Sequence, residues 1–270
     1  MFEAVNNFLQ HVDDLVWGVP LIVAILLTGI YLTIRLKGIQ ITKLPKALKY
    51  MFENEDSGHG EVTSFGALCT ALSATIGTGN IVGVATAIVA GGPGALFWME
   101  IAALFGMATK YSEGLLAIKY RTTDKHGHIL GGPFYYIENG MGKKWTWLAK
   151  IFAFFGMGVG LFGIGTFTQV NGITSAVGNF FDPNAQNVIH LLGRDYTLAV
   201  VISGLILTVC VGLVVIGGLK RIAKVSEIIV PFMAVIYIAI SLLLLILNAN
   251  KIPAAIVEIV SSAFGMRAAA

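Results

Sequence analysis

A run of polar and glycine residues, SATIGTGNIVG at 73–83, interrupts a strongly apolar stretch of the chain. Where a membrane helix unwinds, freed N–H groups and the helix N-terminus can hold an anionic group, and freed carbonyls can hold a cation. Gly77 and Gly79 permit the backbone angles and the close approach that a break requires, and Thr78 and Asn80 add short polar side chains. The run therefore predicts reversible binding of a small charged solute and a cation. The alternative is close packing of small residues against another helix.

A second polar cluster, TFTQVN at 166–171, follows a glycine-rich run at 156–165. Gln169 needs a hydrogen-bonding partner inside a membrane, and its spacing leaves two open: a neighbouring helix, or the amino or carboxylate group of a solute. Gly158-x-Gly160-x-x-Gly163 matches the dinucleotide-binding fingerprint by letter, but no strand precedes it, so we reject that interpretation.

The composition places both clusters in a membrane protein. Of the 270 residues, 56% are hydrophobic and 12% are charged, and the mean hydropathy is +0.80. Soluble domains carry about 25% charged residues, and the strand alternation of a membrane barrel is absent. We expect an all-α membrane protein, a polytopic helical bundle. The sequence shows no phosphate loop and no nucleophile motif, so nothing in it indicates an enzyme.

Six apolar segments predict six transmembrane helices, at 15–34, 64–88, 94–118, 145–179, 196–216 and 228–247. The third is the least apolar because it contains Glu100, Lys110 and Glu113; we expect the last two to pair on one helix face. The second is roughly 37 Å long as a continuous helix at ~1.5 Å per residue. The hydrocarbon core is ~30 Å thick, which leaves slack for unwound residues at 73–83.

Basic residues sort by side of the membrane. Thirteen lie in alternate loops: Arg35, Lys37, Lys43, Lys46, Lys49, Lys119, Arg121, Lys125, Lys143, Lys144, Lys220, Arg221 and Lys224. The opposite loops hold three: Arg194, Lys251 and Arg267. The positive-inside rule predicts a multi-pass protein of the inner (plasma) membrane with its N-terminus outside and its basic loops in the cytoplasm. The net charge of +3 is explained by this sorting and indicates no nucleic-acid partner.

Four stretches carry a family resemblance: SFGALCTALSATIGTGNIVGVATAIVAGGPGALFWM at 64–99, GMATKYSEGLLAIKYR at 106–121, GGPFYYIENGMG at 131–142 and GTFTQVN at 165–171. With them the chain resembles the N-terminal portion of the alanine or glycine:cation symporter (sodium:alanine symporter) family. The resemblance implies secondary active transport: sodium-coupled symport of a small neutral amino acid, alanine or glycine, into the cell. It implies no cofactor beyond sodium as the coupling ion.

The resemblance also implies a leucine-transporter-like fold, in which one outer helix precedes two inverted five-helix repeats and the first helix of each repeat is broken. Residues 1–63 would then hold the extracellular N-terminus, the outer helix and a basic cytoplasmic loop. Residues 64–250 would form the first repeat, and 251–270 a short tail on the outer side. The second repeat is missing from the 270 residues, so we expect an incomplete carrier, with a separately encoded C-terminal half as a possible partner.

The site residues follow from the resemblance. The break would surround the carboxylate of the amino acid with Thr78, Gly79 and Asn80. The second cluster would close the pocket around the small side chain and the amino group with Gly165, Phe167 and Gln169. The coupling sodium would take the backbone carbonyls of Ala74 and Gly77.

Two other functions remain open from the sequence. ATIGTG is similar to a potassium-type selectivity filter, in which carbonyls of a Thr/Gly-rich loop replace the water shell of an ion. A cation channel of that kind needs a re-entrant loop, whereas the charges that flank this segment favour a complete crossing. The other alternative is a non-transporting remnant that associates through its glycine faces. Alanine, glycine and serine are not distinguished as substrates, nor sodium from the proton as the coupling ion.

Overall fold

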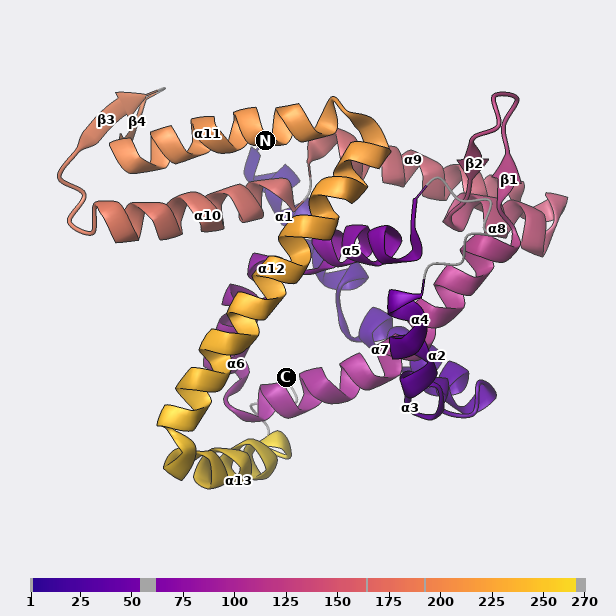
Figure 1. Ribbon diagram of the computed structural model, residues 1–270, viewed down its shortest axis with the longest axis horizontal. Helices are drawn as coiled ribbons and strands as arrows, with labels where there is room; N and C mark the ends of the chain where they lie inside the picture. Colours follow the sequence, from indigo (N-terminus) through magenta and orange to yellow (C-terminus); the bar gives the residue numbers. More distant parts are fainter. Residues whose placement is uncertain (1, 54–61, 164, 192, 266–270) are drawn as a thin grey trace. The chain divides into compact units, whose positions relative to one another are not determined.

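The computed structural model describes residues 2–53, 62–163, 165–191 and 193–265, and most of them are helical (Figure 1). The predicted helical class is confirmed, with one correction. Two short antiparallel hairpins lie between helices: β1 (Thr122–Thr123) pairs with β2 (Ile129–Leu130), and β3 (Val188–Leu191) pairs with β4 (Arg194–Thr197). Both hairpins lie largely outside the apolar segments, and water can therefore hydrate their turns.

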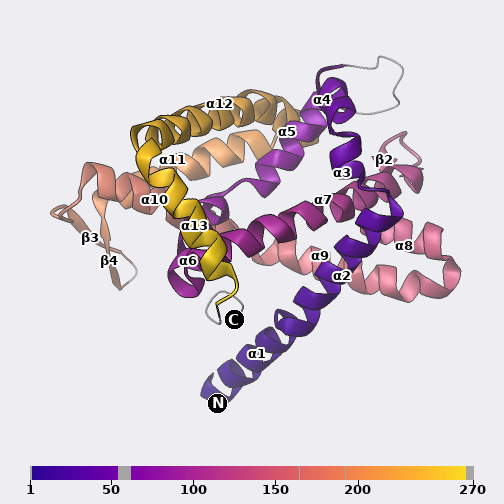
Figure 2. The same ribbon diagram turned by 90° about the horizontal axis from the view of Figure 1, so that it is seen from below.

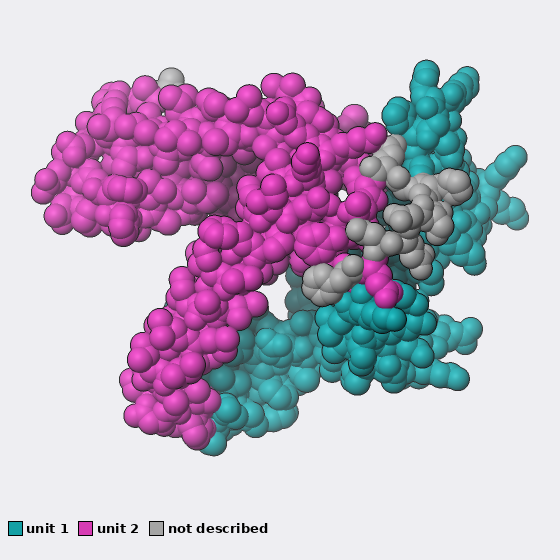
Figure 3. All heavy atoms as spheres, viewed as in Figure 1, with its two compact units in different colours: residues 1–50, 88–150, 256–270 teal, residues 51–87, 151–255 magenta. Residues whose placement is uncertain are grey.

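The helices pack into two compact units (Figure 3). Unit 1 comprises Met1–Tyr50, Ile88–Lys150 and Ile256–Ala270, and unit 2 comprises Met51–Ala87 and Ile151–Ala255. These units reflect which residues pack together in the structure. The predicted division into an N-terminal region (1–63), a first repeat (64–250) and a tail (251–270) rests on the family resemblance and stays a prediction.

Unit 1 is built around one long helix, α7 (Gly94–Lys119), which packs against α2 (Val19–Arg35). The helices are close because Gly29 of α2 is buried: a Cβ there would lie 3.0 Å from the carbonyl oxygen of Phe105. Small residues at a crossing are typical of membrane helices. Most of the remaining helical elements of this unit are α1 (Phe2–Val16), α3 (Ile39–Thr42), α4 (Leu44–Phe52), α8 (Pro133–Met141) and η2 (Lys143–Trp145). Figure 2 shows α1 and α2 following one another along the chain.

The start of α7 also contacts the end of α13 (Ile252–Ala263), which follows η3 (Ala249–Lys251). The indole N–H of Trp98 donates a 2.7 Å hydrogen bond to the carbonyl oxygen of Ala263. A carbonyl at the end of a helix has no donor within its own helix, so this bond satisfies it.

Unit 2 contains α5 (Ser64–Thr75), η1 (Thr78–Asn80), most of α6 (Val82–Gly91) and α9 (Thr146–Phe162), and α10 (Thr166–Phe181), α11 (Leu198–Val215) and α12 (Gly218–Leu247). Within this unit, α5 and α12 make the most extensive helix–helix contact. The buried residues on the two helices are small: Gly66, Cys69, Ala223, Ser226 and Val230.

Hydrogen bonds tie the first turn of α5 to α12. The Thr63 hydroxyl caps α5 by accepting the N–H of Gly66 at 2.9 Å, and it donates to Glu227 Oε1 at 2.8 Å. An acidic side chain near a helix N-terminus is favourable because of the helix dipole. Further along the pair, the Ser226 hydroxyl donates to that of Ser73 at 3.3 Å.

In the part of the chain that the structure describes, four helices are long and apolar enough to cross a membrane, or five if the bent pair at 64–91 is one span. This confirms a polytopic helical protein, although six spans were predicted. The predicted third span is the helix α7. It falls outside that set because Glu100, Lys110 and Glu113 lower its mean hydropathy. As predicted, Lys110 Nζ donates to Glu113 Oε2, at 3.0 Å.

The predicted fourth and sixth spans differ from the structure in their details. Segment 145–179 is divided into α9 and α10 at Gly163 and Gly165, whose φ angles are +59° and +89°, values that glycine adopts readily. The last predicted span, 228–247, belongs to a longer helix, α12, which begins at Gly218 and continues through Pro231. The basic residues of 220–224 therefore lie on helical turns and not in a loop.

Candidate functional site

The helix is interrupted where the polar run predicts it. α5 ends at Thr75, and the backbone is then extended at Ile76 (φ −86°, ψ 117°) and at Gly77 (φ −155°, ψ −163°). The single turn η1 follows, and α6 leaves at 68° to the direction of α5. Hydroxyls near the break turn back on the helix: Ser73 donates to the carbonyl of Thr70, and Thr75 to that of Ala71.

Gln169 of α10 binds the interrupted backbone. The N–H of Thr78 donates to Gln169 Oε1 at 2.8 Å. In a continuous helix this N–H would bind the carbonyl of Ala74, four residues earlier, but the extended residues Ile76 and Gly77 prevent that bond. The break therefore releases the carbonyl of Ala74, while Gln169 satisfies the N–H. Of the two partners left open for Gln169, the structure shows the one on a neighbouring element.

Two glycines allow η1 and α10 to come this close. A Cβ on Gly77 would collide with the amide of Gln169, lying 2.8 Å from Cδ. A Cβ on Gly172 would lie 2.5 Å from Cγ2 of Thr78. The role of Gly172 in this contact was not predicted from the sequence. Its position, one turn after Gln169 on the same face of the helix, is the signal that could have found it.

The predicted site residues divide into two groups. The structure brings Gly77, Thr78 and Gln169 together. The other five are exposed: Ala74, Gly79, Asn80, Gly165 and Phe167. Phe167, although large and apolar, is 75% exposed.

The backbone donors of η1 are not equivalent. The N–H of Asn80 donates to the carbonyl of Gly77 at 3.1 Å, and that of Thr78 is bound to Gln169. Gly79 lies between them, and its N–H makes no hydrogen bond with the described part of the chain. The side chains at the break are neutral. Any charge on a ligand is therefore matched by backbone dipoles and by polar groups.

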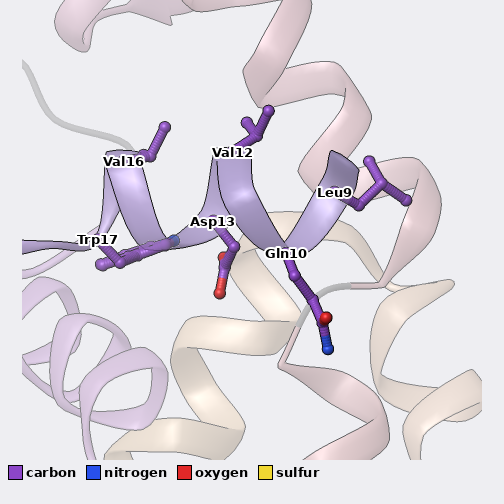
Figure 4. A pocket seen from close by; sticks show the side chains of 6 residues that line it. All are labelled: Leu9, Gln10, Val12, Asp13, Val16 and Trp17. Carbon is purple, nitrogen blue, oxygen red and sulfur yellow. The ribbon is translucent and has the colours of Figure 1, made fainter. Parts of the chain in front are cut away.

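Two hollows among the described residues lie away from the predicted site. The larger is lined by Leu9, Gln10, Val12, Asp13, Val16 and Trp17 (Figure 4). All six belong to α1 or are the residue directly after it. A single helix cannot surround a ligand, so this hollow is not a candidate binding site. The second, with a volume of about 370 Å³, lies between α10 and α11 beside Phe181 and Ile202.

Large apolar side chains are exposed over most helices. Examples are Phe154 (66%), Leu161 (80%) and Ile216 (85%). An exposed apolar surface this extensive needs lipid or further protein to cover it.

The sequence comparisons decide the family. The sodium:alanine symporter family matches residues 2–270. The chain belongs to the sodium:alanine symporter family. The members of this family are membrane transporters and not enzymes, in agreement with the apolar spans and with the lack of enzyme motifs in the sequence.

Among similar members of the family, an uncharacterized transporter of Haemophilus influenzae is 52% identical over 98% of this chain and 54% of its own length. The sodium/alanine symporter AgcS of Methanococcus maripaludis is 46% identical over 97% and 55%. The amino-acid carrier protein AlsT of Bacillus subtilis is 34% identical over 96% and 51%. The chain thus spans about half the length of the curated relatives it matches.

Proposed function

We propose that this chain forms part of a secondary active transporter that couples sodium entry to the uptake of a small neutral amino acid, alanine or glycine. One observation carries the proposal: a membrane helix is broken within a polar run, and a glutamine from another helix binds the opened backbone. An interruption of this kind is tolerated at membrane depth where it lines a cavity or is buried in protein. Membership in the symporter family supports the same function.

The amino acid would bind at η1 with its carboxylate toward the neutral donors there. These are the N–H of Gly79, the hydroxyl of Thr78 and the side-chain amide of Asn80. Gly165, Phe167 and Gln169 would surround the small side chain and the amino group. Gln169 can do this while bound to Thr78, because a carbonyl oxygen has two lone pairs.

Sodium would bind the carbonyl oxygens at the end of α5. Hard cations prefer oxygen ligands, and the carbonyl of Ala74 has lost its helical donor. The carbonyl of Gly77, which accepts from Asn80, keeps a second lone pair for the ion. The two carbonyl ligands of the ion would then lie at the two ends of the segment 74–77, where the helix is interrupted.

The proposed architecture has six crossings. They are the outer helix, the broken span 64–91, α7, the α9–α10 segment, α11 and α12, with 64–250 as a leucine-transporter-like first repeat after 1–63. The sorting of the basic residues supports an N-terminus outside and basic loops inside. The exposed positions of Gly165 and Phe167 fit a pocket whose opposing wall comes from residues beyond these 270, such as a C-terminal half. Alternating access moves one bundle against another around the site.

Uptake of radiolabelled alanine into lipid vesicles tests this function. Vesicles that contain this chain together with the proposed C-terminal half should accumulate alanine when a sodium gradient points inward, and should not with choline in place of sodium. Vesicles with the 270-residue chain alone should show little or no uptake, because the opposing wall is absent. A sodium current that is independent of alanine would support the channel instead. Accumulation by the 270-residue chain alone would contradict the incomplete-carrier proposal.

A further inference from the structure

Gly172 has no backbone reason to be glycine. It lies inside α10, and its φ is not in the left-handed region, so an alanine would fit the local helix. Glycine inside a helix is less favourable than alanine, because it loses more backbone freedom on folding. Some contact must therefore account for the small residue. The contact present is with Thr78, whose methyl group occupies the space that a Cβ at 172 would need.

The contact between η1 and α10 is reciprocal. Gln169 of α10 lies over Gly77 at the start of η1, and Thr78 of η1 lies over Gly172 of α10. Each glycine makes room for a polar side chain of the other element. The hydrogen bond between Thr78 and Gln169 joins the same two elements.

We propose that Gly172 is a positioning residue that sets the direction of the Thr78 hydroxyl. The inference rests on the proposed function, in which that hydroxyl contacts the carboxylate of the amino acid. Three staggered positions surround the Thr78 Cβ. With the methyl group fixed against Gly172, the hydroxyl is held in one of the other two. Cγ2 lies 2.5 Å and Oγ1 3.8 Å from the position of a Cβ at 172, so the methyl group faces the glycine and the hydroxyl lies to one side.

A methyl group added at 172 leaves Thr78 two ways to avoid the collision. The side chain can rotate, which carries the hydroxyl into another staggered position, or η1 can shift away from α10. Both remove the hydroxyl from its present place. Serine at position 78 has no Cγ2, so with serine there the added methyl fits and the hydroxyl can keep its direction.

The test compares Gly172→Ala, Thr78→Ser and the double variant in this chain, assembled with the proposed C-terminal half. Gly212→Ala is the matched control: Gly212 lies inside α11, and beyond its own helix turn no atom of the described residues lies within 4 Å of its Cβ position. The measurements are KM and maximal rate of radiolabelled alanine uptake at saturating sodium, and the melting temperature without alanine. Gly172→Ala should raise KM about tenfold, and the double variant should return KM to within about threefold of Thr78→Ser alone. The control should leave KM unchanged.

Two results would overturn the proposal. One is an unchanged KM in Gly172→Ala with a lower melting temperature, which indicates a packing role alone. The other is a double variant as impaired as Gly172→Ala. If the parent protein takes up no alanine, the proposed function fails, and the melting temperatures test only the contact between Gly172 and Thr78. A lower melting temperature in Gly172→Ala that Thr78→Ser restores supports that contact, and one that Thr78→Ser does not restore contradicts it.

Discussion

Gly77→Ala is expected to abolish most sodium-dependent alanine binding while the protein still folds. The extended backbone at Gly77 suits any residue, so the substitution brings no backbone strain. Its Cβ collides with the amide of Gln169, which is the end of a flexible side chain and can move away. Once it moves, the N–H of Thr78 loses its acceptor. Leaving such a group unsatisfied costs about 1–3 kcal/mol, so we expect affinity to fall about tenfold or more.

Gly83→Ala is the matched control for this prediction. Gly83 lies on the same interrupted span, in α6, and beyond its own helix turn no atom of the described residues lies within 4 Å of its Cβ position. Alanine affinity, measured by equilibrium dialysis in sodium chloride, should change little in this variant. Equal affinities in Gly77→Ala and Gly83→Ala would show that the contact between Gly77 and Gln169 does not matter for binding.

Gln169→Ala and Gln169→Glu are expected to differ strongly from one another. Alanine at 169 removes the acceptor of the Thr78 N–H and the polar groups that Gln169 offers to the amino acid, so we expect binding to weaken about tenfold or more. Glutamate keeps an oxygen for that N–H, and its charge favours the ammonium group of the substrate. Gln169→Glu should therefore retain far more affinity than Gln169→Ala.

Asn171→Ala serves as the control for the Gln169 pair. It shortens a polar side chain on the same helix, two residues further along, at an exposed position. The same dialysis measurement should show little change for it. If Gln169→Glu binds alanine as poorly as Gln169→Ala, the amide N–H groups of Gln169 are what the substrate needs, and its proposed place beside the amino group is wrong.

The interruption of the helix could be predicted from sequence because its cause is local. Consecutive glycine, hydroxyl and amide residues at 73–83 weaken a helix wherever they occur, and the structure breaks the helix there. The pairing of Lys110 with Glu113 was equally local, since residues three apart lie on one helix face.

The contacts made by the break could not be read from the sequence. Nothing in the spacing of residues 91 positions apart shows that the N–H of Thr78 meets Gln169. Gly172 was overlooked for the same reason: within one helix it is a glycine among others, and its meaning comes from the methyl group of Thr78. The length of α12 was underestimated because basic residues at 220–224 resemble a loop, although long basic side chains can extend from a helix to water.

The central claim is that the break itself holds both the amino acid and sodium. The test is equilibrium binding of radiolabelled alanine to this chain, purified with the proposed C-terminal half, in sodium chloride and in choline chloride. Asn80→Ala and Gly83→Ala are measured beside the parent protein. We expect saturable binding that requires sodium, weakens in Asn80→Ala and is retained in Gly83→Ala. Binding that is the same in both salts, or unaffected by Asn80→Ala, would contradict it.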